Sequence, residues 1–461
     1  MRSDAPPVSG PQVFGTVILG GGPGGVALLL AALRRGAFDA LLDDGLAIVE
    51  RASEIGRGAI GDYVITSDSG AETFIDCLQN ATEPMLAALR THPAALDVAR
   101  YMPGAVPLRL VGRLMQVIGD RLSAILIVRG AELLTEHAAL QVRRAPDGLW
   151  QVVTRGLAGG GPRVLLARNV VFSMGGEQPI ERLCHERVGG APLLPRHAAT
   201  VVQSGMLFRA PGRDAVARRL RGIAAPRAVV VGGSTSAVAA ANLLLTQLPD
   251  VTFGAGGVTI LHRRPMRVFY ASAEAALAEN YTEFGPDDIC PLTGRVFRLA
   301  GLRLDSRELL MRARGLGGRP PEPRLRLQMM GELSEAEIDT MLGEADLIVA
   351  ALGYRPRLVP CLDIDGAPLA LRGNTDAMVP LVDDACRVVD GAGAPWPGLF
   401  ALGLANGFVP SGTFGGEASF VGQANGLWLW QTDVGGMVVD QICARRGGPQ
   451  GRTRQAETEV A

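Results

Sequence analysis

Residues 229–245 of this chain read VVVGGSTSAVAAANLLL. Its β-branched start predicts a buried strand, its small residues predict a tight turn, and its Ala- and Leu-rich end predicts a helix. A strand that turns directly into a helix presents free backbone N–H groups at the helix N-terminus, where phosphate binds well. The stretch therefore predicts a phosphate-binding turn.

A second stretch of this kind, TVILGGGPGGVALLLAALRRG, occupies residues 16–36. Its glycines fit G-x-G-x-x-G, in which the first allows a tight turn, the second leaves room for a pyrophosphate and the third lets the helix pack on the strand. Near the start of a long chain this pattern indicates FAD. The predicted cofactor-binding residues here are Gly20, Gly22, Pro23, Gly24 and Gly25.

Glu50 ends the next predicted strand, LAIVE at 46–50, where a carboxylate accepts hydrogen bonds from the adenosine ribose. The alternative is an ordinary glycine-rich turn beside an exposed glutamate. The order of strand, glycine turn, helix, strand and acidic residue favours the FAD site.

In the second turn, Gly232, Ser234 and Ala237 occupy the three glycine positions. The strand after its helix ends in His262, Arg263 and Arg264 instead of a carboxylate, and guanidinium groups suit the 2′-phosphate of NADPH. The alternative is a basic strand end at the surface. The predicted NADPH-binding residues are Gly232, Gly233, Ser234, Thr235, Ser236, Arg263 and Arg264.

Strands and helices alternate along most of the chain, which predicts an α/β fold with two Rossmann-like domains. These two phosphate-binding turns are here called the first cradle (residues 20–25) and the second cradle (residues 232–237). A protein needs both if one holds a flavin and the other holds the coenzyme that gives the flavin a hydride. We expect a tail at 1–11, an FAD domain at 12–221 and 341–445, an inserted NADP domain at 222–340, and a tail at 446–461. We also expect a hairpin at 138–156 with Asp147-Gly148 at its turn, and a last helix within 411–431.

Composition excludes several classes of protein. The 461 residues are 48% hydrophobic and 20% charged, with a net charge of −1 and no basic stripe, which argues against nucleic acid. The apolar runs are too short for a membrane span. The six cysteines are scattered, which suggests reduced thiols and a cytoplasmic protein, and no His, Cys or Asp spacing suggests a metal. A homo-oligomer is left open.

The motifs resemble those of the flavoproteins with two dinucleotide-binding domains, especially the flavin-dependent N-hydroxylating (lysine and ornithine) monooxygenases and the class B flavin monooxygenases. The resemblance rests on GGGPGG at 20–25, GGSTSA at 232–237, ALGYRP at 351–356 and GLFALG at 398–403, and FSMGG at 172–176 is similar to a second copy of the third motif. It implies that NADPH reduces FAD and that O₂ forms a C4a-hydroperoxyflavin. One oxygen atom then passes to a small nucleophilic substrate, plausibly an amine.

The resemblance also implies cofactor contacts from Gly353, Gly403 and the entry to the last helix at Gly415 and Gly416. The loop GRGAIGDYVITSDSGAETF, residues 56–74, returns under the flavin ring in such proteins. We expect Arg57 to bind the cofactor. Ser69 and Glu72 also fit a capping box for a helix at 71–78. The expected substrate contacts are Tyr63, Ser67, Asp68 and Ser69.

Two features depart from these relatives. The stretch F-x-G-x-x-x-H is absent before the second turn, and Leu404 follows Gly403 where many relatives have Asp. A flavin oxidase or reductase with another acceptor therefore stays open, as does a flavoprotein with structural FAD, although the latter needs no hydride donor. The related disulfide reductases use a redox-active cysteine pair, and neither C-x-x-C nor C-x-x-x-x-C occurs. The sequence does not identify a catalytic residue.

Overall fold

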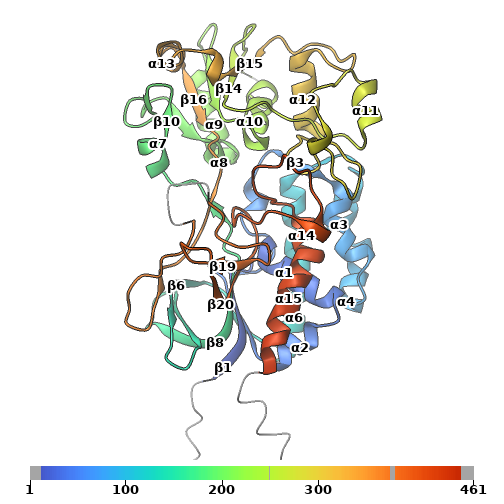
Figure 1. Cartoon of the computed structure of the whole chain (residues 1–461), viewed down its shortest axis with the longest axis vertical. Coiled ribbons are helices and arrows are strands. Elements are labelled where there is room, and N and C mark those ends of the chain that lie inside the picture. The colour runs from blue at the N-terminus through green and yellow to red at the C-terminus, as the bar shows by residue number, and fades with distance from the viewer. Residues whose placement is uncertain (1–11, 249, 374–378, 448–461) are drawn as a thin grey trace, which may run out of the picture.

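The computed structural model describes residues 12–248, 250–373 and 379–447, which form two lobes stacked along the long axis (Figure 1). The lower lobe contains both ends of the described chain and the upper lobe its middle part. The predicted tail at 1–11 and most of the tail predicted at 446–461 lie outside the described residues. Arg445–Gly447 form a short 3-10 turn.

The lower lobe is built on a nine-stranded sheet with β1 (Val13–Leu19) near its centre. This strand pairs in parallel with β2 (Leu46–Val49) and with β8 (Arg163–Phe172), and its last three residues are fully buried. Strands β6 (His137–Arg144) and β7 (Trp150–Gly156) form the expected antiparallel hairpin. The remaining strands of this sheet are β5 (Glu132–Leu134), β18 (Cys361–Leu362), β19 (Arg387–Val389) and β20 (Pro395–Ala401).

Helices cover the lower sheet and hold the first cradle in place. Helix α1 (Pro23–Arg34) begins in the glycine turn and packs against α14 (Leu427–Gln431) and α15 (Asp433–Ala444), as Figure 1 shows. A Cβ at Gly435 would lie 2.8 Å from the Ala31 Cβ, so the two helices touch closely. The other helices of this lobe are α2 (Phe38–Asp43), α3 (Ala71–Gln79), α4 (Pro84–Ala87), α5 (Pro93–Ala99) and α6 (Leu108–Val128).

The upper lobe is built on a five-stranded, all-parallel sheet in the order β12-β16-β13-β14-β15. Its strands are β12 (Val201–Gln203), β13 (Ala228–Val231), β14 (Val258–His262), β15 (Leu325–Met329) and β16 (Leu347–Ala350). Its helices are α7 (Glu181–His185), α8 (Ser204–Leu207), α9 (Ala210–Leu220), α10 (Thr235–Thr246), α11 (Ala273–Ala278), α12 (Leu304–Arg314) and α13 (Glu335–Gly343). The predicted α/β class with two Rossmann-like units is confirmed.

Strand pairing bears on the extent of the inserted domain. Strand β12 precedes residue 222 and β16 follows residue 340, yet both pair within the upper sheet. The limits 222 and 340 stay predictions, and we propose instead that the inserted domain spans residues 181–350, because Leu183 of α7 shares a buried cluster with Val229 and Ile348 of the upper sheet. A central strand such as β16 is held by hydrogen bonds to β12 and β13, so it belongs with the sheet that it completes.

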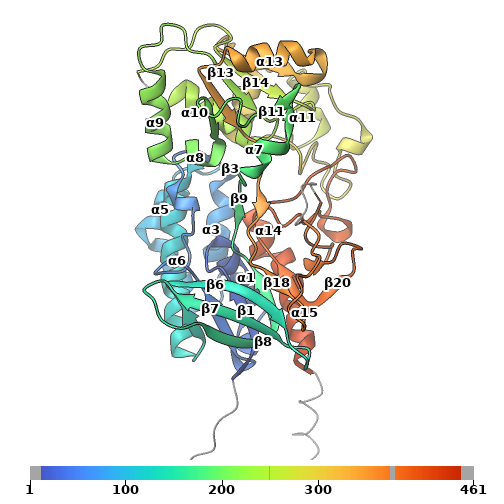
Figure 2. The ribbon, with the colours of Figure 1, turned by 90° about the vertical axis from the view of Figure 1, so that its left-hand side faces the viewer.

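The two connections between the lobes lie side by side. Strand β9 (Gly176–Glu177) follows the FSMGG stretch, and β17 (Arg355–Pro356) lies within ALGYRP; the two strands pair antiparallel. Figure 2 shows β9 between the lobes. The two stretches that look alike in the sequence therefore form one two-stranded joint.

The prediction of a helix within 411–431 is wrong over most of that range, because the helix begins only at Leu427. Gly412, Gly415 and Gly416 adopt φ values of 54°, 65° and 132°, which a right-handed helix does not accept. Residues 411–420, here called the strap, instead run across to the upper lobe. The buried Glu417 carboxylate accepts backbone hydrogen bonds from Leu299 (3.0 Å) and Ala300 (2.7 Å).

Candidate functional site: two nucleotide cradles

The first cradle contains glycines that the fold requires. Gly20 has a φ of 99°, and a Cβ there would lie 2.6 Å from the Ser173 carbonyl oxygen. A Cβ at Gly25 would overlap the Gly20 carbonyl oxygen. These two positions bring α1 onto the ends of β1 and β8, as the sequence pattern predicts.

Gly22 is different, because the fold does not require a glycine there. Its φ is −70°, and the nearest atom to an added Cβ would be the Gly58 Cα, at an ordinary 3.4 Å. The absence of a side chain leaves open space at the N-terminus of α1, where free N–H groups and the positive end of the helix dipole attract a pyrophosphate. Gly24 is similar, since its Cβ would lie 3.4 Å from the Leu402 carbonyl oxygen, and Pro23 is the first helical residue.

Glu50 lies against this turn. Its Oε2 accepts a hydrogen bond from the Gly21 N–H (2.7 Å) and its Oε1 accepts one from the Ala52 N–H (2.8 Å). A carboxylate has about four acceptor positions, so hydroxyl groups of a ribose can still bind to it. The expected place of Glu50 beside the first cradle agrees with the structure, and its ribose contact stays a prediction.

Arg57 lies in a loop beside the same cradle, but its guanidinium is paired with Asp62 at 2.6 Å. The loop is pinned to α6 by two glycines of that helix: a Cβ at Gly112 would overlap Gly61, and one at Gly119 would overlap the Ile55 carbonyl oxygen. Cofactor binding by Arg57 stays a prediction and would compete with its ion pair.

The second cradle repeats the design of the first. Gly232 has a φ of 145°, and a Cβ there would overlap the Ala351 carbonyl oxygen. Gly233 and Ser234 are exposed, and Ser234 is the N-cap of α10 without a side-chain cap bond. The first-turn N–H groups, including those of Thr235 and Ser236, are therefore available to an anion.

The basic strand end lies near this cradle. The buried His262 ring hydrogen-bonds to the Arg264 carbonyl oxygen through Nδ1 (2.9 Å), which fixes the turn after β14. The exposed Arg263 side chain already pairs with Glu186 at 3.0 Å. Among the described residues, the exposed Arg264 side chain has no ion-pair partner, so it is the freer of the two for a 2′-phosphate.

The two remaining motif glycines, Gly353 and Gly403, lie in different parts of the structure. Gly403 (φ 109°) would bring a Cβ to 3.8 Å from the Gly24 Cα, so it borders the first cradle. Gly353 (φ 84°) lies in the joint between the lobes, where the Arg182 side chain donates to its carbonyl oxygen (3.2 Å). Both cofactor contacts stay predictions.

Gly415 and Gly416 do not stand at a helix entry, contrary to expectation. They belong to the strap, and the Gly416 N–H donates to the Cys290 sulfur of the upper lobe (3.3 Å). The Arg298 guanidinium donates to the Phe414 carbonyl oxygen at 2.7 Å beside them. Their position indicates a role in joining the lobes, and cofactor contact stays a prediction.

The four expected substrate residues divide into separate roles. Tyr63 packs edge-on against Phe208 of the upper lobe, with ring centroids 6.1 Å apart. Ser67 ties its own loop together, because its hydroxyl donates to the Ser69 carbonyl oxygen and accepts from the Val106 N–H. The capping box is wrong, since the N-cap of α3 is Gly70 and has no side-chain cap bond. Substrate contact by these residues stays a prediction.

Asp68 lies at the second cradle although it belongs to the lower lobe. Its Oδ2 accepts from the Thr235 hydroxyl (3.3 Å) and its Oδ1 from the Arg303 N–H (3.4 Å). Sequence reasoning missed Arg303 and Glu417 as partners, because no motif surrounds them and their contacts come from segments far away in the chain. What marks these two residues is a charged side chain that becomes buried, and this burial is visible only in the folded structure.

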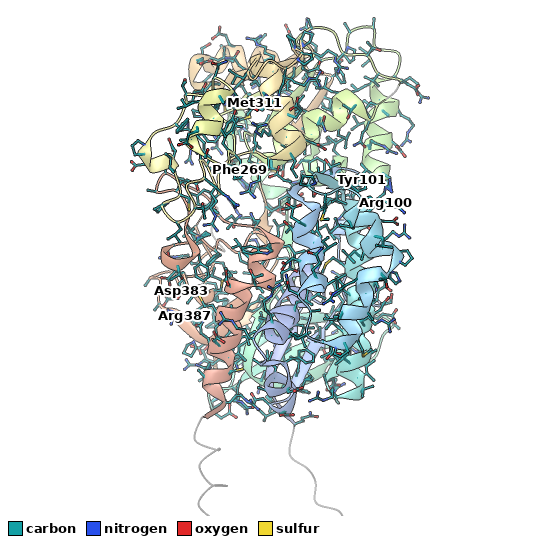
Figure 3. All side chains as sticks on the ribbon, turned by 90° about the vertical axis from the view of Figure 1, so that its right-hand side faces the viewer. Arg100, Tyr101, Phe269, Met311, Asp383 and Arg387 are labelled. Carbon is teal, nitrogen blue, oxygen red and sulfur yellow. The ribbon has the colours of Figure 1, made fainter. Side chains whose placement is uncertain are left out.

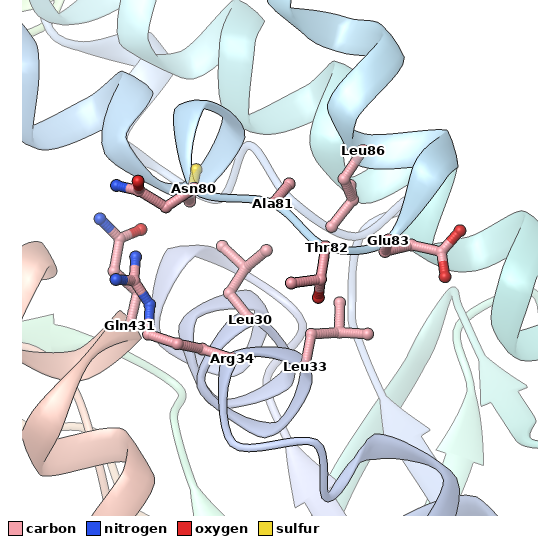
Figure 4. A pocket seen from close by; sticks show the side chains of 10 residues that line it. Leu30, Leu33, Arg34, Asn80, Ala81, Thr82, Glu83, Leu86 and Gln431 are labelled. Carbon is pink, nitrogen blue, oxygen red and sulfur yellow. The ribbon is translucent and has the colours of Figure 1, made fainter.

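Other candidate features lie apart from the cradles. A small pocket between the second half of α1 and the end of α3 is lined by Leu30, Arg34, Cys77, Ala81 and Gln431, among others (Figure 4). Leu30 is about 10 Å along the helix axis from Pro23, so this pocket is not the phosphate site.

Within the described residues there is no group of His, Cys, Asp and Glu fit for a metal. None of the described helices combines the length and apolar character that a bilayer crossing needs.

No family model matches the chain. The chain is, however, 32% identical over 452 residues to the CMP-5′-(3-aminopropyl)phosphonate hydroxylase of Streptomyces rubellomurinus (strain ATCC 31215), a match that covers 95% of this chain and 99% of that protein.

The chain belongs to this hydroxylase family.

Solved structures agree on the fold. The ornithine N-hydroxylase of Kutzneria sp. 744, solved with reduced FAD, NADP⁺ and L-ornithine, superposes with a TM-score of 0.52 at 16% identity, covering 95% of this chain and 100% of that one. The ornithine hydroxylase of Pseudomonas aeruginosa superposes with a TM-score of 0.55 at 12% identity, covering 94% of this chain and 99% of that one. The expected resemblance to flavin-dependent hydroxylases is thereby confirmed at the level of the fold, which in the Kutzneria protein holds FAD and NADP⁺.

Gly22 gives a direct test of the first cradle. Gly22→Ala should fold normally, because the added Cβ meets no closer atom than 3.4 Å, but it should lower the FAD content of the purified protein several-fold. The measurement is flavin absorbance per chain beside far-UV circular dichroism. Gly161→Ala is the control and should keep its flavin, because a Cβ on this loop glycine would meet no atom within 4 Å. Full flavin occupancy in Gly22→Ala would contradict the assignment.

Proposed function

We propose that this protein is an FAD- and NADPH-dependent N-hydroxylase that acts on the primary amine of a cytidylate-linked aminoalkylphosphonate. The full-length match to the CMP-5′-(3-aminopropyl)phosphonate hydroxylase carries the proposal. Two cradles of the right geometry support it, because a hydroxylase of this kind needs both a flavin and a hydride donor. The six cysteines are free thiols, which supports a cytoplasmic enzyme.

The cofactors are assigned to the cradles by their fit. FAD is proposed at Gly20–Gly25 and Glu50, where Gly22 leaves space that the fold does not need. NADPH is proposed at Gly232–Ser236 with Arg264. When bound, the pair supplies a hydride and activates O₂; the overall balance is R–NH₂ + O₂ + NADPH + H⁺ → R–NHOH + H₂O + NADP⁺.

The chain's own residues hold and shield these groups. The two helix N-termini bind the pyrophosphates, and the joint β9–β17 sets how the two lobes face each other. The strap ties the lower lobe to the upper lobe through hydrogen bonds. The Glu417 carboxylate accepts one from the Leu299 N–H, and the Phe414 carbonyl oxygen accepts one from Arg298. Exclusion of water from the reacting groups is the chief contribution expected of the protein in such chemistry.

Arg264 should set the preference for NADPH over NADH. A hydrogen bond to a charged group contributes roughly 1.5–3 kcal/mol, so Arg264→Ala should raise KM for NADPH about 10- to 150-fold and leave KM for NADH nearly unchanged. Arg263→Ala should have a smaller effect, because Arg263 is held by Glu186. Arg218→Ala, an exposed arginine of α9, is the control. An equal loss with both coenzymes would contradict the 2′-phosphate contact.

The substrate can be tested by product balance. With NADPH and O₂, CMP-5′-(3-aminopropyl)phosphonate should yield hydroxylamine product in near-equal amount to the NADPH consumed, measured by mass spectrometry and peroxide assay. Free 3-aminopropylphosphonate and L-ornithine should give mainly H₂O₂, because they lack the nucleotide. Stoichiometric H₂O₂ with every amine would favour the oxidase alternative. Efficient hydroxylation of ornithine would contradict the substrate class.

A further inference from the structure

Asp68 brings a carboxylate from the lower lobe to the start of α10 in the upper lobe. It lies in β3 (Thr66–Gly70), which packs against α12. Its two oxygens accept from the Thr235 hydroxyl (3.3 Å) and the Arg303 N–H (3.4 Å). Thr235 is the first residue of the 12-residue helix α10, so the carboxylate is one side-chain length from the helix N-terminus.

An ionised carboxylate at this place meets the same attraction as a phosphate. The free N–H groups of the first turn and the helix dipole favour a negative charge, and only one anion can occupy the position fully. The glycine turn before α10 is also where the coenzyme's pyrophosphate is proposed to lie. Two negative groups would then compete for one helix end.

We propose that Asp68 is an internal anion at the coenzyme site, and that NADPH binds only after this carboxylate is neutralised by a proton or displaced from Thr235. The proposal rests on the assignment of NADPH to the second cradle. It makes Asp68 a positioning residue that links coenzyme binding to pH and to the contact between the lobes.

The surroundings of Asp68 allow its carboxyl group to gain or lose a proton near neutral pH. Burial raises the pKa of this carboxyl to about 7, and it outweighs the Arg303 guanidinium, which lowers it. Arg303 is itself engaged elsewhere, because it stacks on the Phe269 ring at 4.4 Å and donates to the Arg298 carbonyl oxygen. Figure 3 labels Phe269 on the upper lobe, near its border with the lower lobe.

The other polar groups near Asp68 do not neutralise the charge of its carboxylate. Ser306 on α12 donates a hydrogen bond to Asp68, while Asp305 of the same helix is turned to the Thr66 hydroxyl (2.6 Å). Glu417 of the strap is satisfied by the Leu299 and Ala300 N–H groups. Arg298 is directed at Phe414. Arg303 is therefore the cation beside Asp68, and the balance between it and burial sets the charge.

The sign of the pH dependence follows. Below pH 7 the carboxyl is mostly neutral and does not repel a pyrophosphate; above pH 7 it is ionised and does. If the coenzyme binds only the neutral form, the apparent Kd scales with 1 + 10^(pH − 7), which gives about a tenfold weakening from pH 6 to pH 8.

The test is the Kd of NADP⁺ for the FAD-loaded enzyme, measured by calorimetry between pH 6 and pH 8. Wild type should weaken about tenfold over this range, whereas Asp68→Asn should lose this weakening and keep at pH 8 the affinity that wild type has at pH 6. Because the 2′-phosphate titrates near pH 6 in both proteins, the difference between the two profiles reports Asp68. Asp97→Asn, a surface carboxylate paired with Arg100, is the control and should follow wild type.

A second variant keeps the test independent of how well Asp68→Asn folds. Thr235→Val removes a hydroxyl that stabilises the ionised carboxylate, so it should move the midpoint of the pH profile upward. Identical pH profiles for wild type, Asp68→Asn and Thr235→Val would overturn the proposal while leaving NADPH in the second cradle. No NADP⁺ binding by any variant at any pH would overturn the NADPH assignment as well.

Discussion

Backbone contact at two glycine turns is the constraint on which the structure depends. A side chain at Gly25 would overlap the Gly20 carbonyl oxygen, just after β1, and one at Gly232 would overlap the Ala351 carbonyl oxygen, just after β16, so only glycine allows the following helix to approach. That approach places a helix N-terminus at the carboxyl end of each sheet, and each helix end becomes an anion site. The two proposed cofactor sites follow from these two approaches.

The junction between the lobes combines three structural features with different roles. The paired strands β9 and β17 join the lobes and allow them to face each other. The strap reaches across from the lower lobe and is held by the buried Glu417. Asp68 reaches across from the same lobe and meets Thr235 at the second cradle. The proposed coenzyme site therefore shares side chains with the contact between the lobes, an arrangement that would suit the exclusion of water from the reaction.

Sequence reasoning predicted the parts of this structure that are local in the chain. The two cradles, the hairpin at 138–156 and the strand before Glu50 depend on periodicity and glycine positions, which a sequence displays directly. It failed where contacts between distant segments decide. A helix was expected to include the stretch 411–426, but three positive-φ glycines and the hydrogen bonds of Glu417 hold residues 411–420 as the strap. Asp68 was expected at the substrate, and its contact with α10 comes from a segment 167 positions away.

In the proposed mechanism, one chain holds FAD in the first cradle and NADPH in the second, and a hydride passes from NADPH to FAD. Anaerobic mixing of the FAD-loaded protein with NADPH in a stopped-flow instrument measures this hydride transfer. We expect rapid loss of the oxidised-flavin absorbance with NADPH and slower loss with NADH. No reduction of the bound flavin by either coenzyme would refute this hydride transfer and leave a flavoprotein whose FAD is structural.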